Sequence, residues 1–246
     1  MAHGTASSSL VPVRGNRRLL VWLGWGVLWV ALCSTVTGQS FWMDEAYVAF
    51  LVTTDTFGDM LVHLLGKDDP ALLTPLYLVY ARLWAMVFGV GECALRASNI
   101  PFAALLVAAL AAASNLVFHR PWLLAVFGAS PFVVCYMNEA RPYIPLMATA
   151  TASLTALMAY MERPELRRVT PWICLSAFAL CFAFGISAGF LAPVFLVYGV
   201  STVRRQGLTL ATIVRDWRRP TVVFGPLFLL LLGYYGWALA AGARSI

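Results

Sequence analysis

The sequence predicts an all-α polytopic membrane protein with about seven transmembrane helices. Hydrophobic residues make up 61% of the 246 residues, whereas charged residues make up only 11%. The mean hydropathy is +0.79, which places the chain in the membrane class. The apolar stretches are continuous rather than alternating, as in membrane helices and unlike the strands of a transmembrane barrel.

Seven apolar runs are long enough, or nearly so, to cross a bilayer as helices. They cover residues 19–37, 97–118, 121–137, 142–161, 170–186, 188–203 and 220–241. The first run follows three arginines, is longer than a signal-peptide core and lacks a small-residue cleavage site, so we expect it to be retained. The chain then divides into a cytoplasmic, disordered tail at 1–18 and a seven-span module at 19–246.

One further apolar run, residues 75–90, decides the topology, because every later loop changes side if this run spans. Arg82 lies at its middle, and an arginine at the centre of a span costs about 2.5–3.5 kcal/mol on insertion scales. With 75–90 on the surface, 12 of the 17 basic residues lie inside and 5 outside. This bias follows the positive-inside rule and predicts a cytoplasmic N-terminus.

The same topology places one long loop, residues 38–96, on the outer side. We expect amphipathic helices near 45–54 and 56–66 in this loop, followed by the surface helix 75–90. Eight of the 11 acidic residues also fall outside. The pI of about 9.3 therefore reflects orientation in the membrane, and the sequence does not predict a nucleic-acid partner.

Charged residues from four chain segments would meet on this outer face. The set comprises Asp44, Glu45, Lys67, Asp68, Asp69, Glu92, Arg96, Asn138, Glu139, Arg141 and Tyr143. Acidic side chains beside hydrocarbon are costly and usually functional. Arginines bind phosphate through charge-assisted hydrogen bonds, while a carboxylate can remove a proton from a hydroxyl. The pattern therefore favours a reaction on a lipid phosphate.

Structural roles are open for the same residues. Asp44 and Glu45 also fit a cap on an interfacial helix that begins at Ala46. Arg141 also fits an ion pair with Glu139, and Arg96 fits an interfacial anchor. The sequence has no histidine cluster typical of zinc sites and no Walker or dinucleotide motif, which argues against nucleotide-dependent chemistry.

Three stretches resemble, in this order, the GT-C type membrane glycosyltransferases. They are 42–47 (Trp-Met-Asp-Glu-Ala-Tyr), 75–98 (from Pro-Leu-Tyr-Leu to Arg96 and Ser98) and 138–143 (Asn-Glu-Ala-Arg-Pro-Tyr). The similarity is closest to the group with protein O-mannosyltransferases, aminoarabinose transferases and the bacterial transferases of lipopolysaccharide cores. It covers about residues 19–161, and the seven-span plan resembles the N-terminal module of that family.

The resemblance implies an inverting transfer of a sugar from a polyprenyl-phosphate donor to an acceptor hydroxyl, on the outer face of the bacterial inner (plasma) membrane. Asp44 would be the general base, and Glu45 would orient it or help to bind a cation. Arg141, Arg96 and Lys67 would bind the donor phosphate. The acceptor side or a cation would be served by Asp68, Asp69, Glu139 and Tyr143. Family members differ in whether they need a divalent cation, so the resemblance leaves both the need for this cofactor and its ligands open.

Departures from the family leave alternatives open. The segment 68–75 lacks the second proline or nearby histidine of many relatives, which weakens the acceptor-side assignment. Relatives usually continue beyond the seventh span, whereas this sequence ends at Ile246. The expectations are a minimal enzyme, a truncated product, or a subunit completed by a partner that supplies the missing C-terminal half. A non-catalytic subunit, or a transporter or flippase in contact with membrane lipids, is the alternative to an enzyme.

Overall fold

The computed structural model describes residues 14–65, 74–116, 118–120, 122–162, 196, 200, 203–204, 207 and 209–242. Every element of secondary structure in these residues is helical, so the predicted all-α class is confirmed for them. The first part of the tail, the predicted span 170–186, most of 188–203, and Lys67, Asp68 and Asp69 lie outside the described residues.

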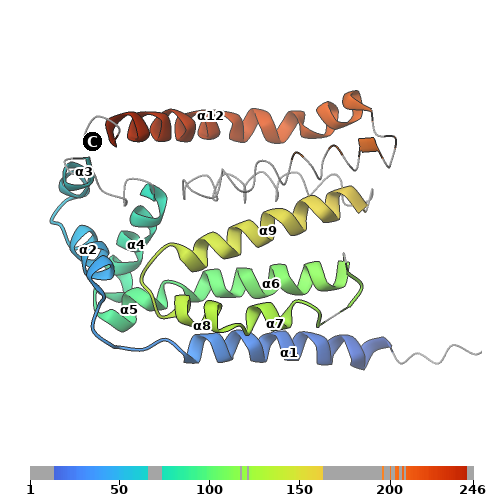
Figure 1. Cartoon of the computed structure of the whole chain (residues 1–246), viewed down its shortest axis with the longest axis horizontal. Coiled ribbons are helices and arrows are strands. Elements are labelled where there is room, and N and C mark those ends of the chain that lie inside the picture. Colours follow the sequence, from blue (N-terminus) through green and yellow to red (C-terminus); the bar gives the residue numbers. More distant parts are fainter. Residues whose placement is uncertain are drawn as a thin grey trace, which may run out of the picture.

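Long helices form a bundle in which neighbours run roughly parallel or antiparallel (Figure 1). They are α1 (Arg14–Ser34), α6 (Ile100–Leu116), α9 (Tyr143–Glu162) and α12 (Leu210–Gly242). The short helices α7 (Ala125–Gly128) and α8 (Pro131–Met137) lie between α1 and α6. Helices α1, α6 and α9 follow apolar runs that the sequence predicts as spans.

Four helices gather at the end of the bundle where α1 ends and where α6 and α9 begin (Figure 1). They are α2 (Met43–Val52), α3 (Phe57–Leu65), α4 (Pro75–Phe88) and α5 (Glu92–Ala97). Helix α4 packs on α5 through two hydrogen bonds: the Tyr80 hydroxyl donates to the Ser98 carbonyl at 2.7 Å, and Trp84 Nε1 donates to the Ala94 carbonyl at 2.8 Å. The loop helices thus form one compact group.

The run 121–137 differs from its prediction as a single span. Helix α7 ends at Gly128 and α8 begins at Pro131, so the run contains two short helices rather than one. A proline has no N–H to donate to the preceding turn and starts a helix more readily than it continues one. The Ser130 hydroxyl accepts a hydrogen bond from the Val133 amide at 3.4 Å and caps the new helix.

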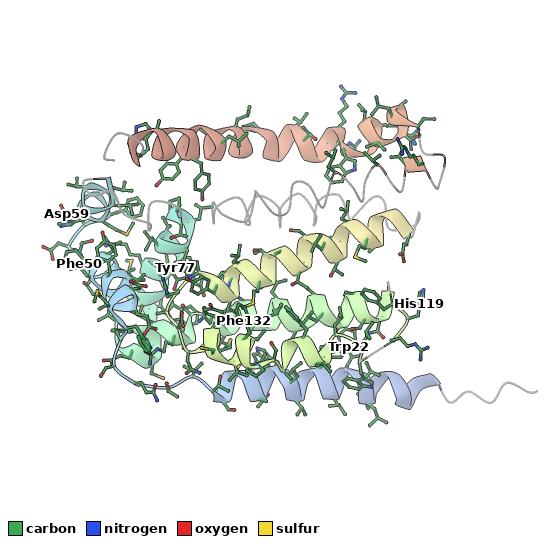
Figure 2. All side chains as sticks on the ribbon, in the orientation of Figure 1. Trp22, Phe50, Asp59, Tyr77, His119 and Phe132 are labelled. Carbon is green, nitrogen blue, oxygen red and sulfur yellow. The ribbon has the colours of Figure 1, made fainter. Side chains whose placement is uncertain are left out.

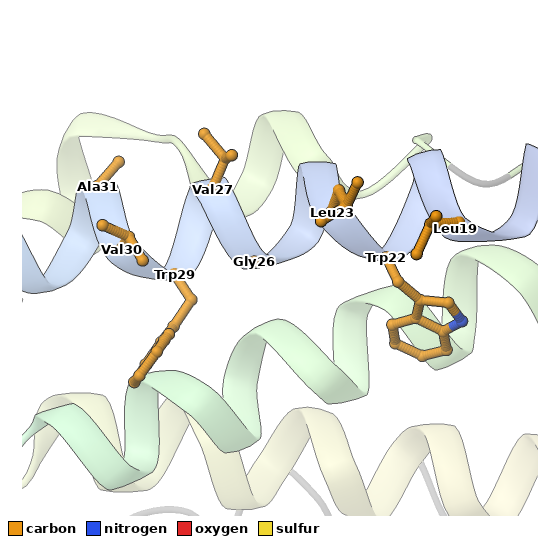
Figure 3. Close-up of a pocket in the computed structure, with 8 residues that line it drawn as sticks. All are labelled: Leu19, Trp22, Leu23, Gly26, Val27, Trp29, Val30 and Ala31. Carbon is orange, nitrogen blue, oxygen red and sulfur yellow. The ribbon is translucent and has the colours of Figure 1, made fainter. Parts of the chain in front are cut away.

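Among the described residues, the segment Glu92–Asn115 is long and apolar enough to cross a membrane, and Leu19–Ser34, Pro75–Phe88 and Tyr143–Ala159 are shorter apolar helices. The outward side chains agree with a membrane protein. Large apolar residues are exposed on several helices, including Val27, Met86, Val126, Val222 and Leu230. An apolar groove of about 620 Å³ also follows α1, lined by residues 19–31 with Gly26 at its middle (Figure 3).

The contact between α6 and α9 is built from small residues. Ala103, Ala111, Ala148 and Ala152 are buried, and the Thr155 hydroxyl donates across the interface to the Ala109 carbonyl at 3.3 Å. Membrane helices associate through small residues and interhelical hydrogen bonds, because lipid supplies no hydrophobic drive. Small residues inside and large apolar ones outside therefore fit the predicted class.

Gly24 provides a test of the packing between α1 and the segment that follows α6. A Cβ atom at Gly24 would overlap the indole of Trp122, which stacks on Trp25 with ring centroids 5.9 Å apart. We expect Gly24→Ala to displace this indole and to destabilise the protein by about 1–3 kcal/mol, seen as a lower melting temperature.

Gly26 is the matched control, since a Cβ atom there meets nothing within 4 Å. Gly26→Ala should leave the melting temperature unchanged or raise it, because alanine favours the helix. Equal melting temperatures for the two variants would contradict the observed packing.

Candidate functional site

The first turn of α2 carries two adjacent acids at the bundle end. Trp42 precedes the helix, and its backbone N–H donates to Glu45 Oε2 at 3.0 Å. Asp44 and Glu45 therefore lie where the helix dipole favours negative charge. Successive helical residues point about 100° apart. Glu45 turns into the protein with 0% of its side chain exposed, whereas the Asp44 side chain is 63% exposed.

Glu45 forms a buried, two-pronged ion pair with Arg96 of α5. Arg96 Nη2 lies 2.8 Å from Glu45 Oε2, and Arg96 Nε lies 3.1 Å from Oε1. The Arg96 side chain is 2% exposed. The backbone N–H of Ala140, in the turn before α9, also donates to Glu45 Oε1 at 2.6 Å. One carboxylate thus joins α2, α5 and that turn.

The remaining N–H groups of Arg96 hold the connection between α1 and α2. Nη1 donates to the carbonyl oxygens of Thr37 and Gln39 at 3.1 and 2.7 Å, and Nη2 donates to that of Ser40 at 3.3 Å. The Phe41 ring lies 5.7 Å from the guanidinium carbon. Each nitrogen of the Arg96 guanidinium therefore donates hydrogen bonds to other groups of the protein.

Burial raises the pKa of Glu45, but the hydrogen bonds from Arg96, Ala140 and Trp42 outweigh it and leave that pKa below its ordinary value. The carboxyl group therefore stays ionised at neutral pH. An ionised group without partners would be costly at this depth, and here each carboxylate oxygen accepts two hydrogen bonds.

A second ion pair lies above the buried one and reaches solvent. Arg141 Nη2 is 2.9 Å from Asp44 Oδ2, and the Arg141 side chain is 32% exposed. The Arg141 guanidinium also lies over the Tyr143 ring, 4.9 Å from its centroid, which orients the cation. Asp44 and Arg141 thus present an exposed carboxylate and a half-buried guanidinium together.

Glu139 is close to this pair but poorly satisfied. Its Oε2 lies 3.9 Å from Arg141 Nη1, beyond hydrogen-bonding distance, and this buried oxygen has no hydrogen-bond partner in the described part of the chain. Burial raises the pKa of Glu139, Arg141 lowers it, and the charges of Glu45 and Asp44 raise it again, so the pKa ends above its ordinary value. The fold therefore disfavours the ionised form.

Two asparagines hold the turn that carries Glu139 and Arg141. The Asn99 amide donates to the Glu139 carbonyl at 2.7 Å, and Asn138 Oδ1 accepts from the Thr37 backbone N–H at 2.9 Å. Asn99 is 0% exposed. The sequence analysis did not identify Asn99, although a buried amide at the start of a span is itself a signal for a specific polar contact.

The structure brings together six of the nine site residues predicted from the sequence: Asp44, Glu45, Arg96, Glu139, Arg141 and Tyr143. The other three, Lys67, Asp68 and Asp69, lie outside the described residues. Among the described residues, no three His, Cys, Asp or Glu side chains gather as a metal site requires. Asp44 and Glu45 are paired with Arg141 and Arg96, which leaves Glu139 as a single acid, so this set does not fit a divalent cation.

No protein family, curated protein or solved structure matches this chain in comparisons with known proteins.

The two buried acids should respond to neutralisation in opposite ways. Glu45→Gln leaves the Arg96 charge buried without a counter-ion, which should cost about 3–5 kcal/mol. Because the pKa of Glu45 is lowered, its stabilising contribution is present above the ordinary pKa and is lost as pH falls through the folded value. The melting-temperature deficit of Glu45→Gln at pH 7 should therefore shrink below about pH 4.5.

Glu139→Gln is the matched comparison. Because the pKa of Glu139 is raised, stability is lost as pH rises through the folded value, so this variant should be at least as stable as the wild type at pH 7. A large loss of melting temperature in Glu139→Gln would instead show that Glu139 forms a structural pair with Arg141.

Proposed function

We propose that the chain spans the membrane seven times, with the α2–α5 end on the extracytoplasmic side. Helices α1 and α12 run toward that end, and α6 and α9 run away from it (Figure 1). The α7–α8 pair makes one pass toward it. The runs 170–186 and 188–203, predicted as spans from the sequence, bring the number of passes to seven.

The charges of the described residues support this orientation. The α2–α5 end carries three basic residues and six acidic ones; they are Arg82, Arg96, Arg141, Asp44, Glu45, Asp55, Asp59, Glu92 and Glu139. The opposite end carries seven basic residues and two acidic ones in the first turns of α1, after α6, at the end of α9 and in the first third of α12; they are Arg14, Arg17, Arg18, Arg120, Arg215, Arg218, Arg219, Glu162 and Asp216. Figure 2 labels His119, the neighbour of Arg120, at this end. Cytoplasmic ends are enriched in arginine and lysine.

Cysteine labelling tests the orientation. In a background without the native cysteines, Gly91→Cys should react with an impermeant maleimide added to intact cells, because Gly91 is exposed next to α5. Arg120→Cys should react only after permeabilisation. Labelling of position 120 alone in intact cells would reverse the proposed orientation.

We further propose that the site at this end transfers a sugar from a polyprenyl-phosphate donor to an acceptor hydroxyl, with inversion at the anomeric carbon. The observation that carries this proposal is the exposed Asp44 carboxylate held 2.9 Å from Arg141. A base and a phosphate-binding cation would thereby meet where the headgroup of a lipid-linked sugar lies.

In the proposed step, the acceptor oxygen attacks the anomeric carbon from the side opposite the phosphate. The bond between that carbon and the phosphate oxygen breaks, and the polyprenyl phosphate leaves with the bonding electrons. Asp44 accepts the hydroxyl proton. Arg141 stabilises the charge that develops on the departing phosphate.

Glu45 and Arg96 have positioning roles in this proposal. The sequence analysis expected Arg96 to bind the donor phosphate, but its guanidinium is buried and donates to Glu45 and to three backbone carbonyls. A side chain so engaged holds Asp44 and the Arg141 turn in place instead. Lys67, Asp68 and Asp69 keep their predicted roles on the donor and acceptor sides.

The contact between Arg141 and Asp44 also predicts the order of donor binding and acceptor activation. Its guanidinium is bound to Asp44 in this structure, so a donor phosphate and the Asp44 carboxylate compete for the same cation. Donor binding would draw Arg141 onto the phosphate and release Asp44 to act as a base. The proposal therefore requires the donor to bind before the acceptor is activated.

Asp44→Asn tests catalysis and competition together. Loss of a general base should lower the rate of sugar transfer by about 10²–10⁴-fold, while a polyprenyl phosphate without sugar should bind more tightly, because the internal anion is gone. Arg141→Lys should weaken binding of the same lipid, since lysine cannot replace a two-pronged guanidinium contact. Melting temperatures of all three proteins check the fold.

Wild-type turnover in Asp44→Asn would make Asp44 a helix cap and would end the catalytic proposal. If the wild type transferred no sugar but the two variants still changed the binding of polyprenyl phosphate, the site would bind an anion without catalysing transfer. That outcome would support the non-catalytic subunit.

A further inference from the structure

A cavity separate from the α1 groove lies at the α2–α5 end of the molecule, and neither Asp44 nor Arg141 lines it. It has a volume of about 400 Å³ and lies between the turn that joins α2 to α3 and one face of α4. The turn contributes residues 55–57, and α4 contributes Val79, Arg82, Leu83 and Met86. A cavity of this size accommodates a lipid headgroup and the first carbons of a chain.

Arg82 supplies a cation to this cavity, and no carboxylate of the described residues forms an ion pair with it. Its Nη1 donates to Thr54 Oγ1 at 2.9 Å, and its Nη2 donates to the carbonyl oxygens of Thr54 and Asp55 at 2.9 and 3.4 Å. These contacts are neutral, and Arg82 forms no ion pair with any described residue. The positive charge is therefore positioned but not neutralised by direct contact.

Asp55 supplies the opposite charge on the rim. Its side chain is exposed and forms no hydrogen bond or ion pair within the described part of the chain. Both residues line the same cavity. The Arg82 guanidinium donates to the backbone carbonyl of Asp55 but forms no ion pair with the Asp55 carboxylate. Such an arrangement suits a ligand that itself carries both charges.

The rest of the lining is apolar and continues onto the outside of the protein. Leu83 and Met86 are 59% and 75% exposed, and the next residues of α4, Val87 and Phe88, are also exposed apolar residues. A hydrocarbon chain leaving the cavity would therefore lie along α4. A guanidinium at the mouth of such a cavity can bind a lipid phosphate through charge-assisted hydrogen bonds.

We propose that this cavity binds a zwitterionic phospholipid of the phosphatidylethanolamine class. The phosphate would accept hydrogen bonds from Arg82, the ammonium would lie beside Asp55, and one acyl chain would follow Leu83 and Met86 along α4. The site depends on a membrane setting but not on the transfer reaction, since neither Asp44 nor Arg141 lines it.

The test uses the full chain in detergent with two short-chain probes, dioctanoyl phosphatidylethanolamine and dioctanoyl phosphatidylglycerol. Both carry a phosphate, and only the first carries an ammonium. Native mass spectrometry should show that the wild type prefers the ethanolamine lipid by about three- to tenfold. Asp55→Asn should abolish this preference without lowering the melting temperature, because the Asp55 side chain has no partner among the described residues. Asp55→Lys should reverse the preference.

Glu92→Gln serves as the control, since it removes an acid of the same end that does not line the cavity; it should keep the preference. Equal binding of the two lipids by the wild type would overturn the proposal. So would binding of neither lipid, or a preference that survives in Asp55→Asn.

Discussion

The buried pair of Glu45 and Arg96 is the constraint on which the rest of the structure depends. Burying two charges costs several kcal/mol of desolvation free energy for each ion. Their mutual attraction offsets this cost only when their other donor and acceptor groups also form hydrogen bonds. Here the Ala140 amide and the carbonyls of residues 37, 39 and 40 complete that requirement. The pair can form only if the α1–α2 connection, α2, α5 and the turn before α9 all arrive together.

This constraint separates the roles of two adjacent acids. A helix that buries Glu45 must turn Asp44 outward, so the inner acid anchors the helix and the outer acid is left for Arg141. Glu139 is left without a close cation: its buried Oε2 accepts no hydrogen bond from the described residues, and its pKa is raised, first by burial. The proposed transfer reaction uses the outer pair, while the inner pair keeps its geometry.

The distribution of polarity explains why two candidate sites share one end of the molecule. Small residues fill the interface between α6 and α9, and large apolar residues cover the outside of the helices. The charged residues of the described helices and turns therefore lie at the two ends, where charge is less costly than beside hydrocarbon. At the α2–α5 end, Arg141 contacts the Asp44 carboxylate, whereas the described residues that accept hydrogen bonds from Arg82 do so through neutral oxygens. That difference underlies the two proposals, a phosphate that competes with an internal acid at one site and a zwitterion at the other.

The sequence by itself determined the helical class, because long continuous apolar runs permit little else. The arginine bias predicted that α2, α4 and the acidic turns lie on one side of the membrane, and these segments do gather at one end of the bundle. The break between α7 and α8 was not predicted, because the run was expected to be one span. Pro131 alone does not determine it, since α12 continues through Pro220 and Pro226. Only the tertiary structure decided that Glu45 pairs with Arg96, 51 residues away, and that Arg141 binds Asp44 more closely than its neighbour Glu139. Periodicity and composition fix which face of a helix is apolar. Ion-pair partners, in contrast, depend on how separate helices pack against one another. Contacts between segments distant in the chain leave no local pattern in the sequence that could predict them.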